Sequence, residues 1–388
     1  MHGTTKGRDV HKATTASFEK AGGPEKCSVI VITPAMLGKK TGLVGLLKAD
    51  GVECPTLHCV IHQEALCGKS IKQEKTFKTV VKVINMIRGG NRALLHRKLQ
   101  TFLEANDAEY GDLLLYNEVR WLSAGGCLRR FFGIRKKIPV ILDQNVSAAT
   151  TVLKNELQST EFLKELAFLA DITHHLNNLN LKLQAKDQLR SSLVGHINGF
   201  RSKLKIFVAS LERNDLTHFE SCGKLFEDFG PDEQPDFSEY AENLKEIESE
   251  FMDRFKDFDI LQTSVLLFTS PLTVDVEIMP HEPEISLELC DLQADPFLKA
   301  RQETGKDFFK LPKNRFPHLR RFGPKMTSMF GSTLICECTF SVLNRIKTNI
   351  RSRLSDESLK HLLRLATTNI AVDIDALVSA AEHPQVSH

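Results

Sequence analysis

The sequence predicts a small α/β region that continues into a long, almost purely helical body. Residues 27–33 and 56–61 are short apolar runs rich in β-branched residues, which is typical of buried strands in a parallel sheet. From about Gln73 onward, apolar residues recur every three or four positions, the spacing of one helix face. The predicted fold class is therefore α/β plus α.

The N-terminal elements follow from these runs and from their glycines and prolines. We expect a helix over residues 8–21 that ends at Gly22, and a second helix over residues 37–50 that ends at Gly51. Pro34 ends the first strand. The resulting order, helix–strand–helix–strand, is that of an α/β unit.

Farther along the chain, apolar spacing and helix-capping residues place the remaining elements. Helices are expected over residues 73–88, 94–105, 166–183, 193–211 and 237–258, with an acidic loop over 227–236. Residues 270–300 combine a loop with a short helix whose stripe is Leu287, Leu289 and Leu292. Ser355 is placed to cap a final helix.

Composition limits the class of protein. With 41% hydrophobic and 26% charged residues, the chain is expected to be a globular protein with a substantial core. A net charge of +2 means that nucleic-acid binding would depend on local patches. An odd count of nine cysteines and a polar N-terminus indicate a reducing compartment, and no apolar run is long enough to span a bilayer.

Several residues could bind a metal or a nucleic-acid base, judged from their type and their neighbours in the sequence. Glu337, in an apolar run, is either an exposed helix acid or one ligand of a metal site. Cys59 and His62 are two of the four ligands that a structural zinc site needs, and we favour a packing role for both. Trp121, the only tryptophan, is either a core anchor or a stacking surface.

Near the C-terminus, a basic run and an amphipathic helix suggest binding surfaces. The cations are Arg345, Lys347, Arg351 and Arg353. They contact phosphates or form an ordinary solvated face, which is the commoner situation. The apolar residues of the final segment are Leu354, Leu359, Leu362, Leu363 and Ala366. This stripe packs either on a second copy of the chain or on its own helices.

Separated motifs, in order along the chain, carry a resemblance to a known family. They are GLVGLLK, HCVIHQEALCGK, YGDLLLYNEVRWLS, ELAFLADITHHLNNLNLKLQ and MFGSTLICECTFS. Together they resemble transposases of the hAT (hobo/Activator/Tam3) superfamily, in particular the transposase-derived part of the general transcription factor II-I repeat domain-containing protein 2 group. The resemblance covers nearly the whole chain.

The resemblance implies a partial RNase H-like core interrupted by a helical insertion. It divides the chain into residues 1–70 (strands four and five with flanking helices), 71–310 (insertion), 311–370 (returning helix and dimerisation region) and 371–388 (flexible tail). Strands one to three, and the first catalytic Asp with them, are expected to be missing.

Only some of the family's functional residues have a matching residue in this chain. Glu337 matches the third acid of the Asp-Asp-Glu triad, but Val31 stands where the second belongs and has no oxygen for a metal. Cys59 and His62 match the family's Cys-x-x-His motif. Arg120 and Trp121 match an Arg-Trp motif whose Trp lies near the family's active site and can stack on an unpaired base.

Three hypotheses follow for function. The first is a non-catalytic, transposon-derived nuclear protein, not an enzyme, that dimerises and has DNA or nuclear proteins as partners, without cofactor, membrane or small-molecule substrate. DNA contacts are expected at Arg120, Trp121, Arg345, Lys347, Arg351 and Arg353. The second is a non-functional remnant. The third is an active transposase or nuclease that uses Mg²⁺ or Mn²⁺.

Overall fold

The structure is a computed structural model. It describes residues 6–32, 36, 38, 40–52, 54, 56–69, 71, 74–88, 93–105, 110–114, 122–143, 148–184, 190–278, 283–303, 305–330, 342–343, 345–348, 354–368, 373, 376–377 and 379. The chain divides into two compact units, Met1–Phe330 and Gly331–His388. The boundaries at residues 70 and 310 expected from the family resemblance stay predictions.

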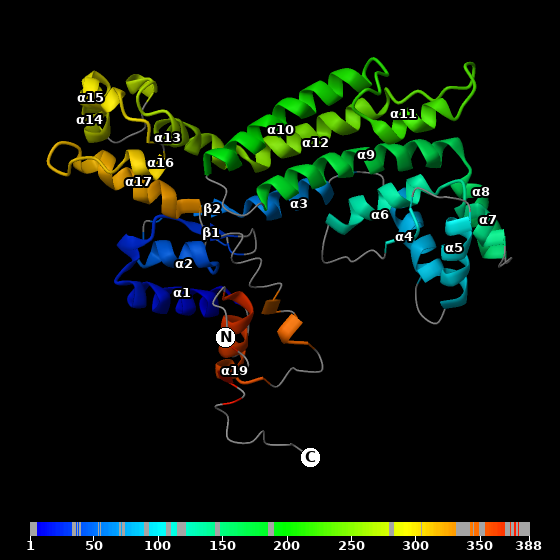
Figure 1. Cartoon of the computed structure of the whole chain (residues 1–388), viewed down its shortest axis with the longest axis horizontal. Coiled ribbons are helices and arrows are strands. Elements are labelled where there is room, and N and C mark those ends of the chain that lie inside the picture. The colour runs from blue at the N-terminus through cyan, green and yellow to red at the C-terminus, as the bar shows by residue number, and fades with distance from the viewer. Residues whose placement is uncertain are drawn as a thin grey trace. The chain divides into compact units, whose positions relative to one another are not determined.

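The small sheet lies in the first unit and is parallel, as predicted (Figure 1). Strands β1 (Ile30–Ile32) and β2 (Thr56–His58) pair with Val31 opposite Leu57. Both strands are shorter than the apolar runs that predict them. Helices α1 (Gly7–Ala21) and α2 (Leu43–Ala49) pack together beside the sheet.

Glycines set the ends of these first helices. Gly22 and Gly51 have φ angles of 89° and 75°, a left-handed conformation that other residues adopt only with strain, and both predicted helix ends are confirmed. The helix predicted from residue 37 begins only at Leu43. Gly42 precedes it with an extended backbone (φ −79°, ψ 164°), because glycine does not favour continuing a helix.

The rest of the first unit is helical. Its α-helices are α3 (Val60–Lys69), α4 (Glu74–Arg88), α5 (Ala93–Ala105), α6 (Leu122–Gly133), α7 (Ile138–Leu142), α8 (Ala148–Leu157), α9 (Thr160–Leu183), α10 (Arg190–Leu211), α11 (Glu220–Glu227), α12 (Tyr240–Arg254), α13 (Asp259–Thr269), α14 (Pro283–Ala294), α15 (Pro296–Lys299), α16 (Gly305–Phe308) and α17 (Pro317–Phe330). Short 3₁₀ turns are η1 (Pro24–Lys26), η4 (Lys256–Phe258) and η5 (Val276–Ile278).

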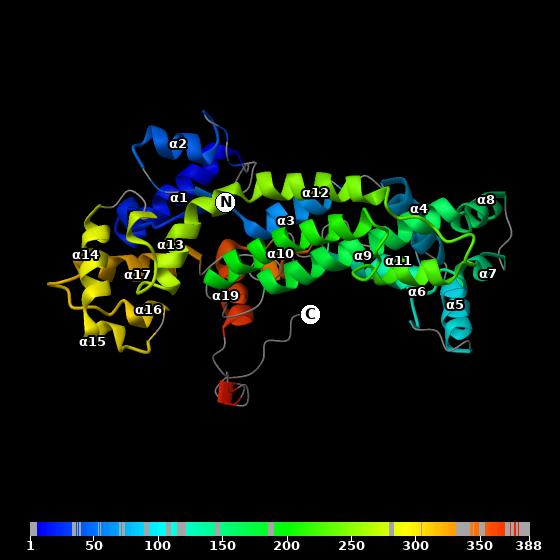
Figure 2. The same cartoon turned by 90° about the horizontal axis from the view of Figure 1, so that it is seen from above.

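Long helices form the centre of this body. Helix α10 packs between α9 and α12, and α9 also contacts α3, α6 and α11 (Figure 2). Fully buried apolar side chains line these contacts, among them Phe168 on α9, Leu204 on α10 and Phe251 on α12. One continuous hydrophobic cluster therefore runs from Cys67 on α3 to Met326 on α17.

Two buried carboxylates tie helices of this body together. Asp171 on α9 accepts hydrogen bonds from the backbone N–H groups of Ser221 (2.9 Å) and Cys222 (3.0 Å), at the start of α11. Glu288 on α14 likewise accepts from His318 (3.0 Å) and Leu319 (2.8 Å), at the start of α17. Each carboxylate satisfies orphan N–H groups of a different helix and faces the positive end of its dipole.

The stripe predicted for residues 270–300 is wrong at one position. Leu287 on α14 is 71% exposed, whereas Leu289 and Leu292 are fully buried together with Ile285 at 5% exposure. Positions 285, 289 and 292 share one helix face, and residue 287 is turned well away from it because each residue advances the helix by about 100°.

The second unit contains the helix α19 (Asp356–Thr367). Its predicted cap is confirmed, because the Ser355 hydroxyl accepts a hydrogen bond of 3.2 Å from the Ser358 backbone N–H. On this helix Leu359, Leu362 and Leu363 are half-buried, and Ala366 is exposed.

Candidate functional site around Asp112

Several residues predicted to act at a site lie outside the described part of the chain. They are Arg120, Trp121, Glu337, Arg351 and Arg353. Arg345 and Lys347 are described and exposed, and Leu354 is half-buried.

Val31, which stands where the family carries its second acid, lies in the middle of β1. Its neighbour Ile32 is 2% exposed, and the Ile32 carbonyl accepts a hydrogen bond of 2.9 Å from the Cys59 backbone N–H. Cys59 therefore links the end of β2 to β1 and directly precedes α3. His62 follows on α3, with a side chain outside the description.

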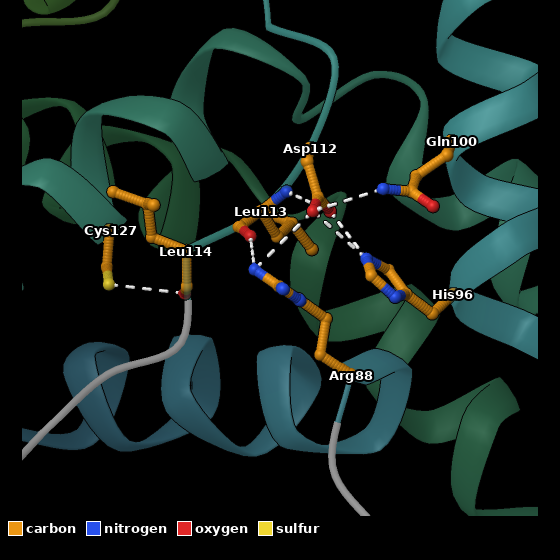
Figure 3. Close-up of polar contacts among 7 residues, drawn as sticks. All are labelled: Arg88, His96, Gln100, Asp112, Leu113, Leu114 and Cys127. Atoms are coloured by element: carbon orange, nitrogen blue, oxygen red, sulfur yellow. Dashed lines mark hydrogen bonds and ion pairs between the residues drawn. The ribbon is translucent and has the colours of Figure 1, made fainter. Parts of the chain in front are cut away.

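A compact polar cluster surrounds Asp112, just before the segment that carries Arg120 and Trp121 in the sequence (Figure 3). His96 Nε2 lies 2.9 Å from Oδ1 of Asp112 and 3.0 Å from Oδ2. Gln100 donates to Oδ2 at 3.4 Å, and Arg88 Nη1 lies 3.5 Å from the same oxygen. The carboxylate thus joins the end of α4 to one face of α5.

The cluster holds the backbone of the Asp112 segment as well as its side chain. Arg88 donates to the Leu113 carbonyl, and the Cys127 thiol, on α6, donates to the Leu114 carbonyl at 3.3 Å (Figure 3). The Arg130 guanidinium, also on α6, lies 5.6 Å from the centre of the Tyr110 ring, a cation–π distance. Residues 110–114 are therefore fixed to three helices by charged and neutral contacts.

These contacts hold residues 110–114 through the side chain of Asp112 and through the backbone of its neighbours. The Asp112, His96 and Arg88 side chains are each 23% exposed, so their hydrogen bonds are partly shielded from water. Bonds to a charged group contribute about 1.5–3 kcal/mol each. Across the described ranges, no three His, Cys, Asp or Glu side chains come close enough to hold a metal ion.

Sequence reasoning did not identify Asp112 or its partners. Residues 110–114 follow neither a helical nor a strand period, so no pattern marks their side chains as buried. Its partners Arg88, His96 and Gln100 come from α4 and α5. Only an isolated Asp before an apolar Leu-Leu-Leu run hints that its carboxylate has a specific role.

A second group missed by the sequence is the buried carboxyl of Glu64, on α3. Glu64 is fully buried, and its Oε2 accepts a hydrogen bond from the Asn180 amide on α9. Its Oε1 has no hydrogen-bond partner among the described atoms. Burial raises the pKa of Glu64 to about 8, only partly opposed by the Asn180 hydrogen bond. This carboxyl is therefore largely neutral at pH 7.

Comparison with known proteins places the Asp112 cluster inside a matched domain. Residues 58–212 match the model of the FAM200/GTF2IRD2 helical domain. General transcription factor II-I repeat domain-containing protein 2 of Bos taurus is 32% identical over 378 residues, which are 95% of this chain and 38% of the relative. Its counterpart in Mus musculus is 31% identical over 323 residues, covering 81% of this chain and 33% of the relative.

The chain is thus a transposase-derived protein with a helical body of hAT origin. Its residues 58–212 match the FAM200/GTF2IRD2 helical domain, and the resemblance drawn from its motifs is confirmed. The chain spans little more than a third of the length of these relatives.

Proposed function

We propose that this chain is a non-catalytic, transposase-derived protein that self-associates and binds DNA or a nuclear partner. The observation that carries the proposal is Val31 in β1. At the position where the family places its second metal-binding acid, the strand presents an isopropyl group, which cannot ligate Mg²⁺ or Mn²⁺. The relatives are named general transcription factor II-I repeat domain-containing proteins, and this name supports a nuclear role.

The architecture supports the same proposal. We interpret β1 and β2 as strands four and five of an RNase H-like sheet and the helical body as the insertion. The body has a continuous core, and its Asp112 cluster holds the chain just ahead of Arg120 and Trp121. A helical body that keeps a continuous core, together with an altered catalytic position at Val31, fits a protein that binds without cutting.

Self-association is proposed to use α19. Its predicted face carries Leu359, Leu362 and Leu363, only half-buried within the chain. Apolar side chains in this state gain free energy when a second copy covers them, at about 25 cal/mol per Å² of apolar surface removed from water. Among the described helices, none is long and apolar enough to cross a membrane.

Catalysis and DNA binding are tested on the purified chain with supercoiled plasmid and Mg²⁺ or Mn²⁺. We expect the plasmid to be retarded on a gel and to remain uncut. Metal-dependent nicking by the wild-type chain that is lost in Glu337→Gln would overturn the non-catalytic proposal. A thermal melt of the same sample tests the remnant hypothesis, because a sharp cooperative transition is expected of a folded protein.

Self-association is tested by light scattering coupled to size-exclusion chromatography. We expect the wild-type chain to elute as a dimer or larger oligomer and Leu362→Glu to shift it toward monomer. Leu365→Glu is the matched control on the same helix, because residue 365 lies off the predicted face. A monomeric wild-type chain would refute this part of the proposal.

A further inference from the structure

A groove of about 420 Å³ is lined by residues of α9 and α10. Four lining residues of α9 are His175, Asn178, Leu179 and Lys182, which share one helix face because they are three or four positions apart. From α10 the groove is lined by Gly195, His196, Gly199, Phe200 and Lys203. Leu179 and Phe200 are almost fully buried and form an apolar floor.

The two glycines of α10 keep this groove open. A Cβ atom built at Gly195 or Gly199 would meet nothing within 4 Å, so neither glycine is there to let a neighbouring helix pack closely. Glycine inside a helix costs about 1 kcal/mol relative to alanine. Two glycines four positions apart therefore lower the stability of α10 and receive no packing contact in return. They leave helix backbone accessible to a ligand.

The walls of the groove are positively charged. Lys182 and Lys203 are exposed, and neither pairs with a carboxylate of any described residue. The two helix stretches that flank the groove, residues 172–183 and 190–211, contain no Asp or Glu. Burial and the charges of Lys182 and Lys203 lower the pKa of His196, which leaves a neutral imidazole that can donate one hydrogen bond.

We infer that the α9–α10 groove binds the phosphate backbone of a nucleic acid, with Lys182 and Lys203 as its principal cations. This inference rests on the proposed DNA binding. It adds a binding surface that contains none of the DNA-contact residues predicted from the sequence. Cations and neutral N–H donors bind phosphates, and the groove supplies Lys182, Lys203 and the Asn178 amide. The Asn178 Nδ2 atom also lies 3.0 Å from His174 Nε2, which leaves its second N–H for a phosphate. His175 is held in place, since its Nε2 lies 2.9 Å from the His218 carbonyl oxygen.

The test measures binding of a fluorescein-labelled duplex DNA of mixed sequence, and of its single strand, to the whole chain at several salt concentrations. We expect Lys182→Glu with Lys203→Glu to weaken binding at least about ten-fold. The slope of log K against log salt should fall by about 2, because each phosphate contact contributes about 0.9. Lys12→Glu with Lys299→Glu is the control, since it changes the net charge equally at exposed lysines far from the groove in sequence.

A second variant tests the shape of the groove without changing its charge. Gly195→Leu with Gly199→Leu fills the groove and favours the helix, so it should reduce DNA binding while the thermal transition stays or rises. If the wild-type chain binds no nucleic acid, the proposed DNA binding fails and the inference fails with it. If it binds and both groove variants bind as the control does, the inference alone fails. Equal competition by poly-glutamate would assign the groove to acidic peptides and overturn it too.

Discussion

Replacing Glu64 with Gln tests whether the carboxyl buried between α3 and α9 holds a proton in the folded protein. Glu64 is fully buried, and its pKa is raised from 4.5 to about 8 by burial. Among the described residues, its hydrogen bond comes from the Asn180 amide. Gln has almost the same shape and can accept the same hydrogen bond, but it has no proton to release.

The expected magnitude follows from linkage between protonation and folding. The folded pKa of Glu64 lies above its unfolded value, so between pH 4.5 and about 8 the folded state binds a proton that the unfolded state has released. The free energy of unfolding therefore falls as the pH rises through this window and levels off above it. At about 1.4 kcal/mol per pH unit, the loss amounts to roughly 4–5 kcal/mol if the whole shift is expressed.

Urea unfolding of the wild-type chain and of Glu64→Gln, measured between about pH 5 and pH 9, gives the comparison. Other groups contribute to both proteins alike, so the difference between the two curves isolates Glu64. We expect Glu64→Gln to become the more stable of the two, by a few kcal/mol, as the pH approaches 8. Glu104→Gln, at an exposed position of α5, is the control and should run parallel to the wild type. Parallel curves for Glu64→Gln would refute the neutral-carboxyl reasoning.

The remaining predictions concern the carboxylates that tie segments together. Asp171→Asn should lower the free energy of unfolding by about 1–3 kcal/mol, because an amide can accept only one of the two backbone N–H bonds at the start of α11; urea unfolding measures this. Glu288→Gln should cost a similar amount at the start of α17 for the same reason. Asp112→Ala should release residues 110–114 and speed limited proteolysis between α5 and α6, visible by mass spectrometry of the fragments.

Controls for these variants use exposed acids in comparable elements. Asp253→Asn, on α12, should leave the free energy of unfolding nearly unchanged, because its ion pair with Lys256 is exposed to solvent. A similarly small effect of Asp171→Asn or Glu288→Gln would show that these carboxylates do not hold their partner helices. An unchanged proteolytic pattern in Asp112→Ala would show that the remaining contacts of residues 110–114 hold this segment without the Asp112 carboxylate.

Local sequence patterns determined much of this fold. Gly22 and Gly51 end helices because glycine alone adopts the left-handed conformation without strain, and Ser355 caps α19 through its own hydroxyl. The β-branched runs placed both strands and predicted their parallel pairing. The family motifs predicted the hAT origin, which the matched domain and the two relatives confirm.

Only the tertiary structure decided which polar residues matter. Asp112 meets His96 and Arg88, Glu64 meets Asn180, and Asp171 caps a helix that begins about fifty residues later. In the sequence these acids look like many others, since most carboxylates are solvated. Likewise, only the tertiary structure shows that no neighbouring atom packs against Gly195 and Gly199 of α10. Local patterns reflect short-range backbone preferences, whereas burial, pKa and groove charge depend on residues that folding brings together from distant positions.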